Sequence, residues 1–418
     1  MDINAGFIFN ETSSTRNNNV SRESIKKENE SSYLYGYNNI TNESNVDVTG
    51  GVNSVTIYLM DNSFFTFNLL RKGPLTGAQI LFELSLYVGG DYKHISEMFS
   101  LWMISPLLEM PLGSEDKPSE VRDKWEMLLK KYSWKYKKYP KKDVPCLVIK
   151  RNYLMEKEKE KEILNFYQEK GYNELYSFFT KILFMDARDE YLRGRYLVDE
   201  DDENTLTEML VSLSEYEVGS EKINEGFLKE INRSLRPKHH TSYHSFIHEV
   251  SFKLKEVFNE TNTSINSILY KKFDSPITIM TAFLEKVRIY NTYGSIFYKG
   301  YLSDKAIKNL KGPYKENFIS KIISHLQTTY RQIIVWINHS TFGIYESKNF
   351  NIIYRTSINS IRWTISPEME GYIQSFYLFH DNGSSNFTEI AGENAFLIHI
   401  ALTILTTHNN NNSNRMIH

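Results

Sequence analysis

The chain has 418 residues, of which 41% are hydrophobic and 14% aromatic, enough to build the cores of two or three domains. Its 49 basic and 51 acidic residues give a net charge of −2, which argues against a nucleic-acid-binding protein because such proteins carry a strong basic excess. Cys146 is the only cysteine, so the chain can form neither an intramolecular disulfide nor a thiolate metal site, and we expect a reducing compartment.

Both ends of the chain differ in composition from the middle. Residues 1–50 are rich in Asn, Ser, Glu and Thr and have too few apolar positions to order themselves, so we expect a disordered arm there and a similar tail at 408–418. No stretch approaches the roughly 20 apolar residues that a membrane span needs, and the first residues lack the features of an export signal. The sequence therefore predicts a cytosolic protein.

Strand-like alternation dominates the first third of the chain. The apolar pattern predicts five strands and two helices in the order ββαββαβ, a ubiquitin-like ordering. The predicted elements are strands at 54–59, 64–70, 99–104, 107–112 and 146–150, and helices at 78–88 and around Trp125. We expect the first helix to end at the pair Gly89 and Gly90.

The hydrophobic period changes to helical near residue 156 and back to strand-like near residue 293. The alternating Glu and Lys residues at 156–162 suit a solvated linker or helix start. After the helical block, the pattern predicts strands at 332–337, 342–346, 350–355, 360–364 and 373–380, with an amphipathic helix inserted at 315–327 and a terminal helix at 391–406.

Three segments of these blocks resemble one known family. They are FSLWMISPLLEMPLGSEDKPSEVRDKW at 99–125, LFMDARDEYLRGRY at 183–196 and FLEKVRIYNTYGSIF at 283–297. Together they resemble FERM domains, most closely the small group of FERM-domain-containing protein eight. The resemblance implies an α+β, three-lobed FERM cloverleaf: a ubiquitin-like lobe at 52–152, a helical acyl-CoA-binding-protein-like lobe at 156–291, and a pleckstrin- or phosphotyrosine-binding-like lobe at 293–407.

Catalytic and metal sites find little support in the sequence. The motifs GxSxG, GxxxxGK and GxGxxG are absent, so we predict no catalytic residues and no cofactor. His240, His244 and His248 would line one face of a helix, but no HExxH motif or carboxylate of known spacing accompanies them. A solvated helix face explains them better than a metal site does.

A basic tract follows the helix around Trp125. Residues 130–142 contain seven lysines and four aromatic residues, which could hold an anionic lipid surface. The candidate lipid-binding residues are Lys135, Lys137, Lys138, Lys141 and Lys142. The alternative, a solvated loop that keeps the surface soluble, stays open.

The terminal helix carries two apolar stripes where its own sheet can cover only one. The second stripe comprises Phe396, Leu397, Ile400 and Ile404. In a phosphotyrosine-binding-like fold, partner peptides add as a strand beside the fifth strand and pack on this helix. We therefore predict a peptide-binding groove formed by Ile361, Arg362, Trp363, Phe396, Ile400 and Ile404. Packing between lobes is the alternative.

The resemblance also implies a function. It predicts a non-enzymatic adaptor, peripheral at the plasma membrane, that binds the cytoplasmic region of iRhom pseudoproteases and stabilises the complex of iRhom and its sheddase. A Wnt co-receptor tail is a further implied partner, and anionic phospholipids are possible ligands of the basic tract. Two alternatives stay open: an effector of Ras-type GTPases, resembling the Krev-interaction-trapped proteins, and a linker between membrane and cytoskeleton.

Overall fold

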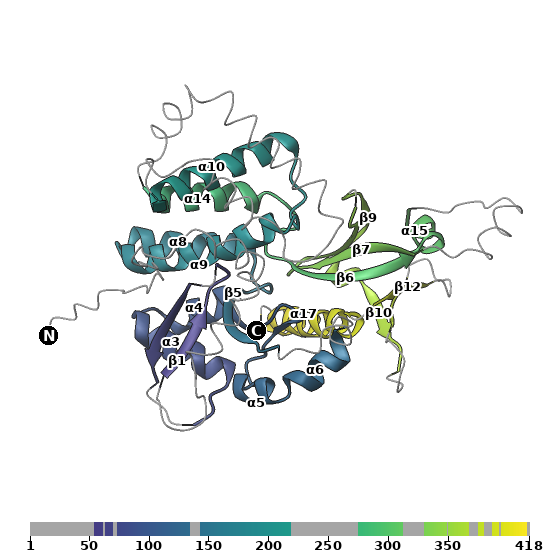
Figure 1. The fold of residues 1–418 in the computed structure, drawn as a ribbon, viewed down its shortest axis with the longest axis horizontal. Coiled ribbons are helices and arrows are strands. Elements are labelled where there is room, and N and C mark those ends of the chain that lie inside the picture. Colours follow the sequence, from purple (N-terminus) through teal and green to yellow (C-terminus); the bar gives the residue numbers. More distant parts are fainter. Residues whose placement is uncertain are drawn as a thin grey trace, which may run out of the picture. The chain divides into compact units, whose positions relative to one another are not determined.

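The computed structural model describes residues 54–61, 63–69, 73–133, 143–218, 275–311, 330–348, 350–367, 375–379, 387–392 and 394–415 (Figure 1). The chain divides into two compact units, Met1–Lys150 and Arg151–His418. The predicted arm at 1–50, the inserted helix at 315–327 and the histidines at 240, 244 and 248 lie outside the described residues.

The first unit is a five-stranded sheet with helices. Strand order is β2-β1-β5-β3-β4, and β1 runs parallel to β5 while the hairpin partners run antiparallel. All five predicted strands are present, the structure adds α4 (Tyr92–Met98) directly before β3, and it has two helices, α5 and α6, where one was predicted around Trp125. The elements are β1 (Ser54–Tyr58), β2 (Phe64–Asn68), α3 (Gly77–Val88), α4 (Tyr92–Met98), β3 (Phe99–Ile104), β4 (Glu109–Pro111), α5 (Pro118–Asp123), α6 (Trp125–Tyr132) and β5 (Cys146–Arg151).

Local sequence signals fix both ends of α3. Thr76 and Gln79 form a capping box, in which each side chain accepts a hydrogen bond from the other residue's main-chain N–H. Gly89 ends the helix in the left-handed conformation, with φ of 71°, which glycine adopts without steric cost. Between these caps, Leu84 is fully buried and anchors the helix in the core of the unit.

The second unit begins with helices. They are α8 (Lys157–Glu169), α9 (Asn173–Leu192), α10 (Glu200–Val218) and α14 (Pro276–Arg288). Aromatic rings hold α9 to α14: the ring of Phe283 lies 5.2 Å from that of Phe184 and 5.8 Å from that of Tyr191, in both cases edge to face. The predicted helical block is thus present on both sides of residues 219–274, which lie outside the described residues.

The second unit continues with a seven-stranded antiparallel sheet whose strand order is β10-β11-β12-β6-β7-β8-β9. Its strands are β6 (Ile296–Ser303), β7 (Tyr330–Ile337), β8 (Thr341–Glu346), β9 (Ile352–Ser357), β10 (Arg362–Ile365), β11 (Ser375–Phe379) and β12 (Phe387–Ala391). Helix α15 (Asp304–Lys311), the 3₁₀ turn η2 (Ile358–Ser360) and helix α17 (Ala395–Arg415) complete the unit.

The terminal helix differs from the prediction at both ends. Ala391, expected as its first residue, instead closes β12 by pairing with Ser375 and Tyr301. Gly392 turns the chain with a φ of 147°, and α17 begins three residues later. The helix runs past residue 406 because the sequence from Ala395 to Arg415 contains no Gly or Pro to end it.

A buried aromatic cluster joins the helices of this unit to its sheet. Trp336 and Tyr345 lie on neighbouring strands with ring centroids 5.6 Å apart, and Leu197, which follows α9, packs against them. Gly343 faces Trp336 across the strand pair, and a Cβ atom there would lie 2.0 Å from the indole ring. Only glycine therefore fits at position 343.

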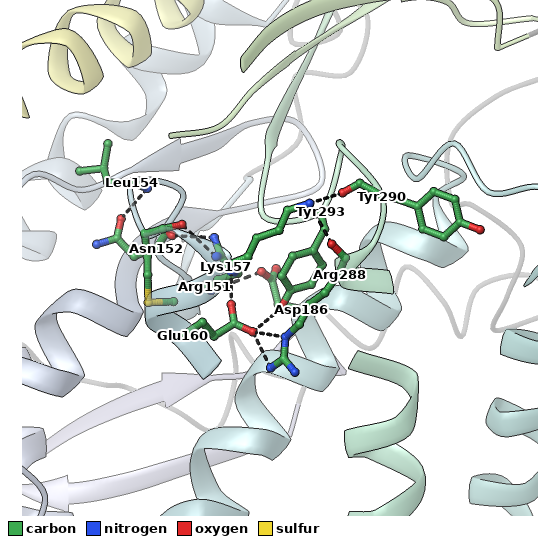
Figure 2. A network of polar contacts seen from close by, with 10 residues as sticks. Arg151, Asn152, Leu154, Lys157, Glu160, Asp186, Arg288, Tyr290 and Tyr293 are labelled. Atoms are coloured by element: carbon green, nitrogen blue, oxygen red, sulfur yellow. Dashed lines mark hydrogen bonds and ion pairs between the residues drawn. The ribbon is translucent and has the colours of Figure 1, made fainter. Parts of the chain in front are cut away.

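A buried ion cluster, drawn in Figure 2, is the second connection between the helices and the sheet of this unit. Glu160 on α8 is fully buried, and its Oε2 accepts a hydrogen bond of 2.5 Å from Arg151 Nε. Its Oε1 accepts from Arg288 Nε on α14 and from the Tyr293 hydroxyl ahead of β6, both at 2.7 Å. The sequence interpretation of 156–162 as a solvated segment is therefore wrong for Glu160.

The charges of this cluster compensate one another. Burial alone would raise the pKa of Glu160, but the positive charges of Arg151 and Arg288 outweigh it and hold that pKa below its ordinary value. Burial and the adjacent Glu160 charge raise the pKa of Tyr293, so its hydroxyl stays a neutral donor. Lys157 Nζ also donates to the carbonyls of Arg288 and Tyr290, at the end of α14.

We expect Glu160→Gln to lower the free energy of unfolding by about 3–5 kcal/mol, because it removes the negative charge that two buried guanidinium groups share. Urea unfolding of the full chain measures this. Glu162→Gln is the matched control, since Glu162 is exposed and pairs with the exposed Lys159; its effect should stay below about 0.5 kcal/mol. Equal effects of the two changes would contradict the structural role of the cluster.

The same cluster predicts a dependence on pH. Because the pKa of Glu160 is lower in the folded state than its ordinary value of 4.5, its contribution is complete above pH 4.5. That contribution is lost as the pH falls through the folded pKa. The free energy of unfolding of the wild type should therefore fall with acidification below pH 4.5, and Glu160→Gln should reduce this slope. An unchanged slope in the variant would assign the acid sensitivity to other carboxyl groups.

Candidate functional site

Strand β10 stands at one end of the seven-stranded sheet. Its neighbour is β11, and within the part of the chain that the structure describes no strand lies on its other side. In an antiparallel edge strand, half of the main-chain N–H and C=O groups point away from the sheet. β10 can therefore accept a further strand through main-chain hydrogen bonds.

Helix α17 packs on this end of the sheet, against β10, β11 and η2. Figure 1 shows α17 beside β10. Its inner face is buried throughout, and consists of Ala395, Leu397, Ile398, Ala401, Leu402 and Leu405. On the outer face, Phe396 and Ile400 are half-buried and Ile404 is 37% exposed. Leu397, which the sequence places in the second stripe, thus belongs to the inner face.

A hydrogen bond connects the strand to the helix. Trp363 Nε1–H donates to Nδ1 of His399 at 3.1 Å, which requires that His399 Nδ1 carry no proton. The ring of Phe396 lies 6.2 Å from that of His399, one helical turn away. Trp363 is half-buried, whereas its strand neighbours Arg362 and Thr364 are exposed. Trp363 therefore faces the helix, and its two neighbours face the other side of the sheet.

The structure brings some of the predicted peptide-binding residues together and separates others. Trp363 and Phe396 meet around His399, and Arg362 is exposed beside them on β10. Ile361 is only 7% exposed, so it packs as part of the core and offers little surface to a partner.

Ile400 and Ile404 lie further around α17 from His399 than Phe396 and Thr403 do. At 3.6 residues per turn, they are rotated by about 100° and about 140° from His399 around the helix axis. Phe396 and Thr403 are rotated by only about 60° and about 40°. The helix surface nearest to β10 thus comprises Phe396, His399 and Thr403.

Sequence reasoning missed His399 and Thr403. The predicted stripe includes apolar residues four positions apart, namely Phe396, Ile400 and Ile404. His399 and Thr403 are polar and follow Phe396 at spacings of three and seven, which also place them on one helical face with it. That spacing was visible in the sequence. The sequence does not give the position of β10, and that position decides which face of α17 lies beside the edge strand. We call the surface formed by Arg362, Trp363, Phe396, His399 and Thr403 the β10–α17 surface.

The other candidate sites give no functional site among the described residues. The predicted lipid-binding lysines at 135, 137, 138, 141 and 142 lie outside the described residues. Among the residues that are described, no group of three His, Cys, Asp or Glu side chains could hold a metal ion. No helix in the described ranges combines the length and apolar character required to cross a bilayer. The oxygens of Glu160 are engaged by Arg151, Arg288 and Tyr293, so this carboxylate is a structural group.

Comparison with known proteins agrees with this architecture. No family model matches the chain. FERM domain-containing protein 8 of Xenopus laevis is 25% identical over 219 residues, which are 52% of this chain and 44% of that protein. The solved MyTH4-FERM domain of human myosin 7b, in complex with the harmonin-a PDZ3 domain, has a TM-score of 0.51 and 12% identity, over 85% of this chain and 60% of that chain.

The myosin VII MyTH4-FERM MF1 domain of Dictyostelium discoideum matches equally well, with a TM-score of 0.51, 12% identity, and coverage of 85% of this chain and 60% of that chain. The chain therefore has the fold of FERM domains. At such identities the solved structures show the fold alone. The match to the curated FERM relative spans less than half of that relative's length.

Within this fold, the position of Trp363 predicts a modest contribution to stability. Trp363→Ala should lower the free energy of unfolding by about 1–2 kcal/mol, because the side chain is half-exposed at a sheet edge. Trp336→Ala is the matched control; Trp336 is fully buried in the same sheet, and its loss should cost about 3–5 kcal/mol. Thermal unfolding of both variants measures the difference. Equal losses would make Trp363 a core residue.

Proposed function

We propose that this FERM protein is a non-enzymatic adaptor that binds a cytoplasmic segment of a membrane protein at the β10–α17 surface. The open edge of β10 beside α17 is the observation that carries the proposal. Partner binding occurs in the fold, since the human myosin 7b MyTH4-FERM domain forms a complex with the harmonin-a PDZ3 domain. An adaptor with an open strand edge needs no catalytic residue to act.

The proposed mode of binding is strand addition. A partner segment pairs with β10 through main-chain hydrogen bonds, and every second side chain points toward Phe396, His399 and Thr403 on α17. The hydrogen bond between Trp363 and His399 holds one wall of this surface in place before the partner arrives. A surface that is already ordered loses less conformational entropy on binding.

The partner that we propose is the N-terminal cytoplasmic region of an iRhom pseudoprotease, with stabilisation of the complex of iRhom and its sheddase as the outcome. Similarity to FERM domain-containing protein 8 supports this identity. The tail of a Wnt co-receptor is a second proposed partner of the same kind. We also propose a cytoplasmic location peripheral to the plasma membrane, with lobes at 52–152, 156–291 and 293–407 and with the basic tract as a lipid contact.

Two adjacent residues of α17 test the location of the site. Thr403 is exposed on the side of the helix near β10, so Thr403→Glu should place a charged side chain in the path of the added strand. We expect it to weaken binding of the iRhom cytoplasmic region to the full chain about tenfold, equivalent to about 1.4 kcal/mol. Ile404→Glu should change binding by less than about twofold. Isothermal titration with the purified cytoplasmic region measures both.

Equal melting temperatures of the two variants are the control for folding. Weaker binding by Ile404→Glu alone would move the site to the outer stripe of Phe396, Ile400 and Ile404. If neither change affects binding, the partner does not dock on α17. In that case, a GTP-dependent pull-down with Rap would examine the GTPase-effector alternative, in which the open edge strand β2 of the first unit would bind the partner.

A further inference from the structure

Strand β10 presents two chemically different faces to anything that pairs with it. Trp363 and Ile365 are half-buried and lie on the face toward α17, whereas Arg362 and Thr364 are exposed on the opposite, outer face. Residues directly opposite each other in an antiparallel pair lie on the same face of the sheet. The side chains of an added strand would therefore meet these two faces alternately.

The outer face can be described from the strand register. One row across the sheet contains Arg362, Phe379 and Phe387, and the next contains Thr364, Tyr377 and Glu389. Phe379 and Phe387 are 38% and 53% exposed. Arg362 is thus the basic residue of this face on β10, at the sheet edge.

Arg362 has no acidic partner among the residues that the structure describes. Glu389 shares its face but lies two strands away, about 10 Å at the usual strand spacing, and one row further along. A carboxylate on a strand paired with β10 would have its Cβ only about 5 Å from that of Arg362. The open side of the edge therefore offers the shortest approach for a counter-charge to Arg362.

We propose that the segment bound at β10 runs antiparallel to it and carries an acidic residue opposite Arg362, with apolar residues opposite Trp363 and Ile365. All strand pairs of this sheet are antiparallel, which is the reason for the direction. Read from its N-terminus, the bound segment has the order apolar, any residue, apolar, acidic. This inference rests on the proposed function, because it assumes that β10 is the docking edge.

Selection from a displayed library of random 12-residue peptides tests the inference on the full chain. We expect wild-type protein to enrich peptides with the order apolar, any, apolar, acidic. The variant Arg362→Glu should instead enrich Lys or Arg at the last of these positions. Arg355→Glu is the matched control, because Arg355 is an exposed arginine on β9, at the opposite end of the sheet. This variant should select the same peptides as the wild type.

A single enriched peptide, synthesised and labelled, gives the quantitative test. Its affinity should fall about fivefold to tenfold in Arg362→Glu, since an attractive cross-strand pair becomes a repulsive one. Replacing the peptide's acidic residue by Lys should restore binding to this variant. The loss should also diminish at high salt, because the pair is exposed and screened.

The outcomes separate this inference from the proposed function. Peptides whose binding is lost in Thr403→Glu but is indifferent to Arg362→Glu would overturn the acidic requirement and leave the docking edge in place. Peptides with the acidic residue first would overturn the antiparallel direction. If no enriched peptide depends on Thr403, both the docking edge and the inference fail.

Discussion

The buried carboxylate of Glu160 is the interaction on which the second unit depends. Its partners Arg288 and Tyr293 are 128 and 133 residues away in the sequence, and Arg151 stands at the opposite end of the short connection to α8. A charge buried without partners would cost several kcal/mol, so the segments that carry these groups must meet in one arrangement. The cluster thereby fixes α8, α14 and the start of β6 together.

The position of β6 then decides where the rest of the sheet lies. β6 pairs with β7 along its whole length, and through Tyr301 it also pairs with Ala391 at the end of β12. β12 pairs with β11 and β11 pairs with β10, so β10 (Arg362–Ile365) is the strand at this end of the sheet. The open edge is therefore a consequence of the strand order, and α17 packs beside it after the chain has left β12 at Gly392.

Stability and the proposed binding depend on different parts of this unit. The Glu160 cluster and the pair of Trp336 and Tyr345 are buried and connect helices to sheet. The β10–α17 surface consists instead of half-exposed or exposed side chains. Trp363 joins the two roles, because its indole packs toward α17 and its Nε1–H is fixed by His399. A partner bound at this edge, as we propose, would leave the buried connections intact.

Sequence alone determined the strands of the first unit, because alternation and glycine stops are local signals: the strand predicted at 99–104 is β3, and Gly89 ends α3 as expected. It also supported the FERM resemblance through three continuous segments. Only the tertiary structure decided what depends on distant partners. Glu160 sits among alternating charges that favour a solvated face, yet it is buried, because its two arginines arrive from elsewhere in the chain. Likewise, the two stripes of α17 were visible in the sequence, but the side that faces β10 follows from the hydrogen bond between Trp363 and His399, 36 residues apart.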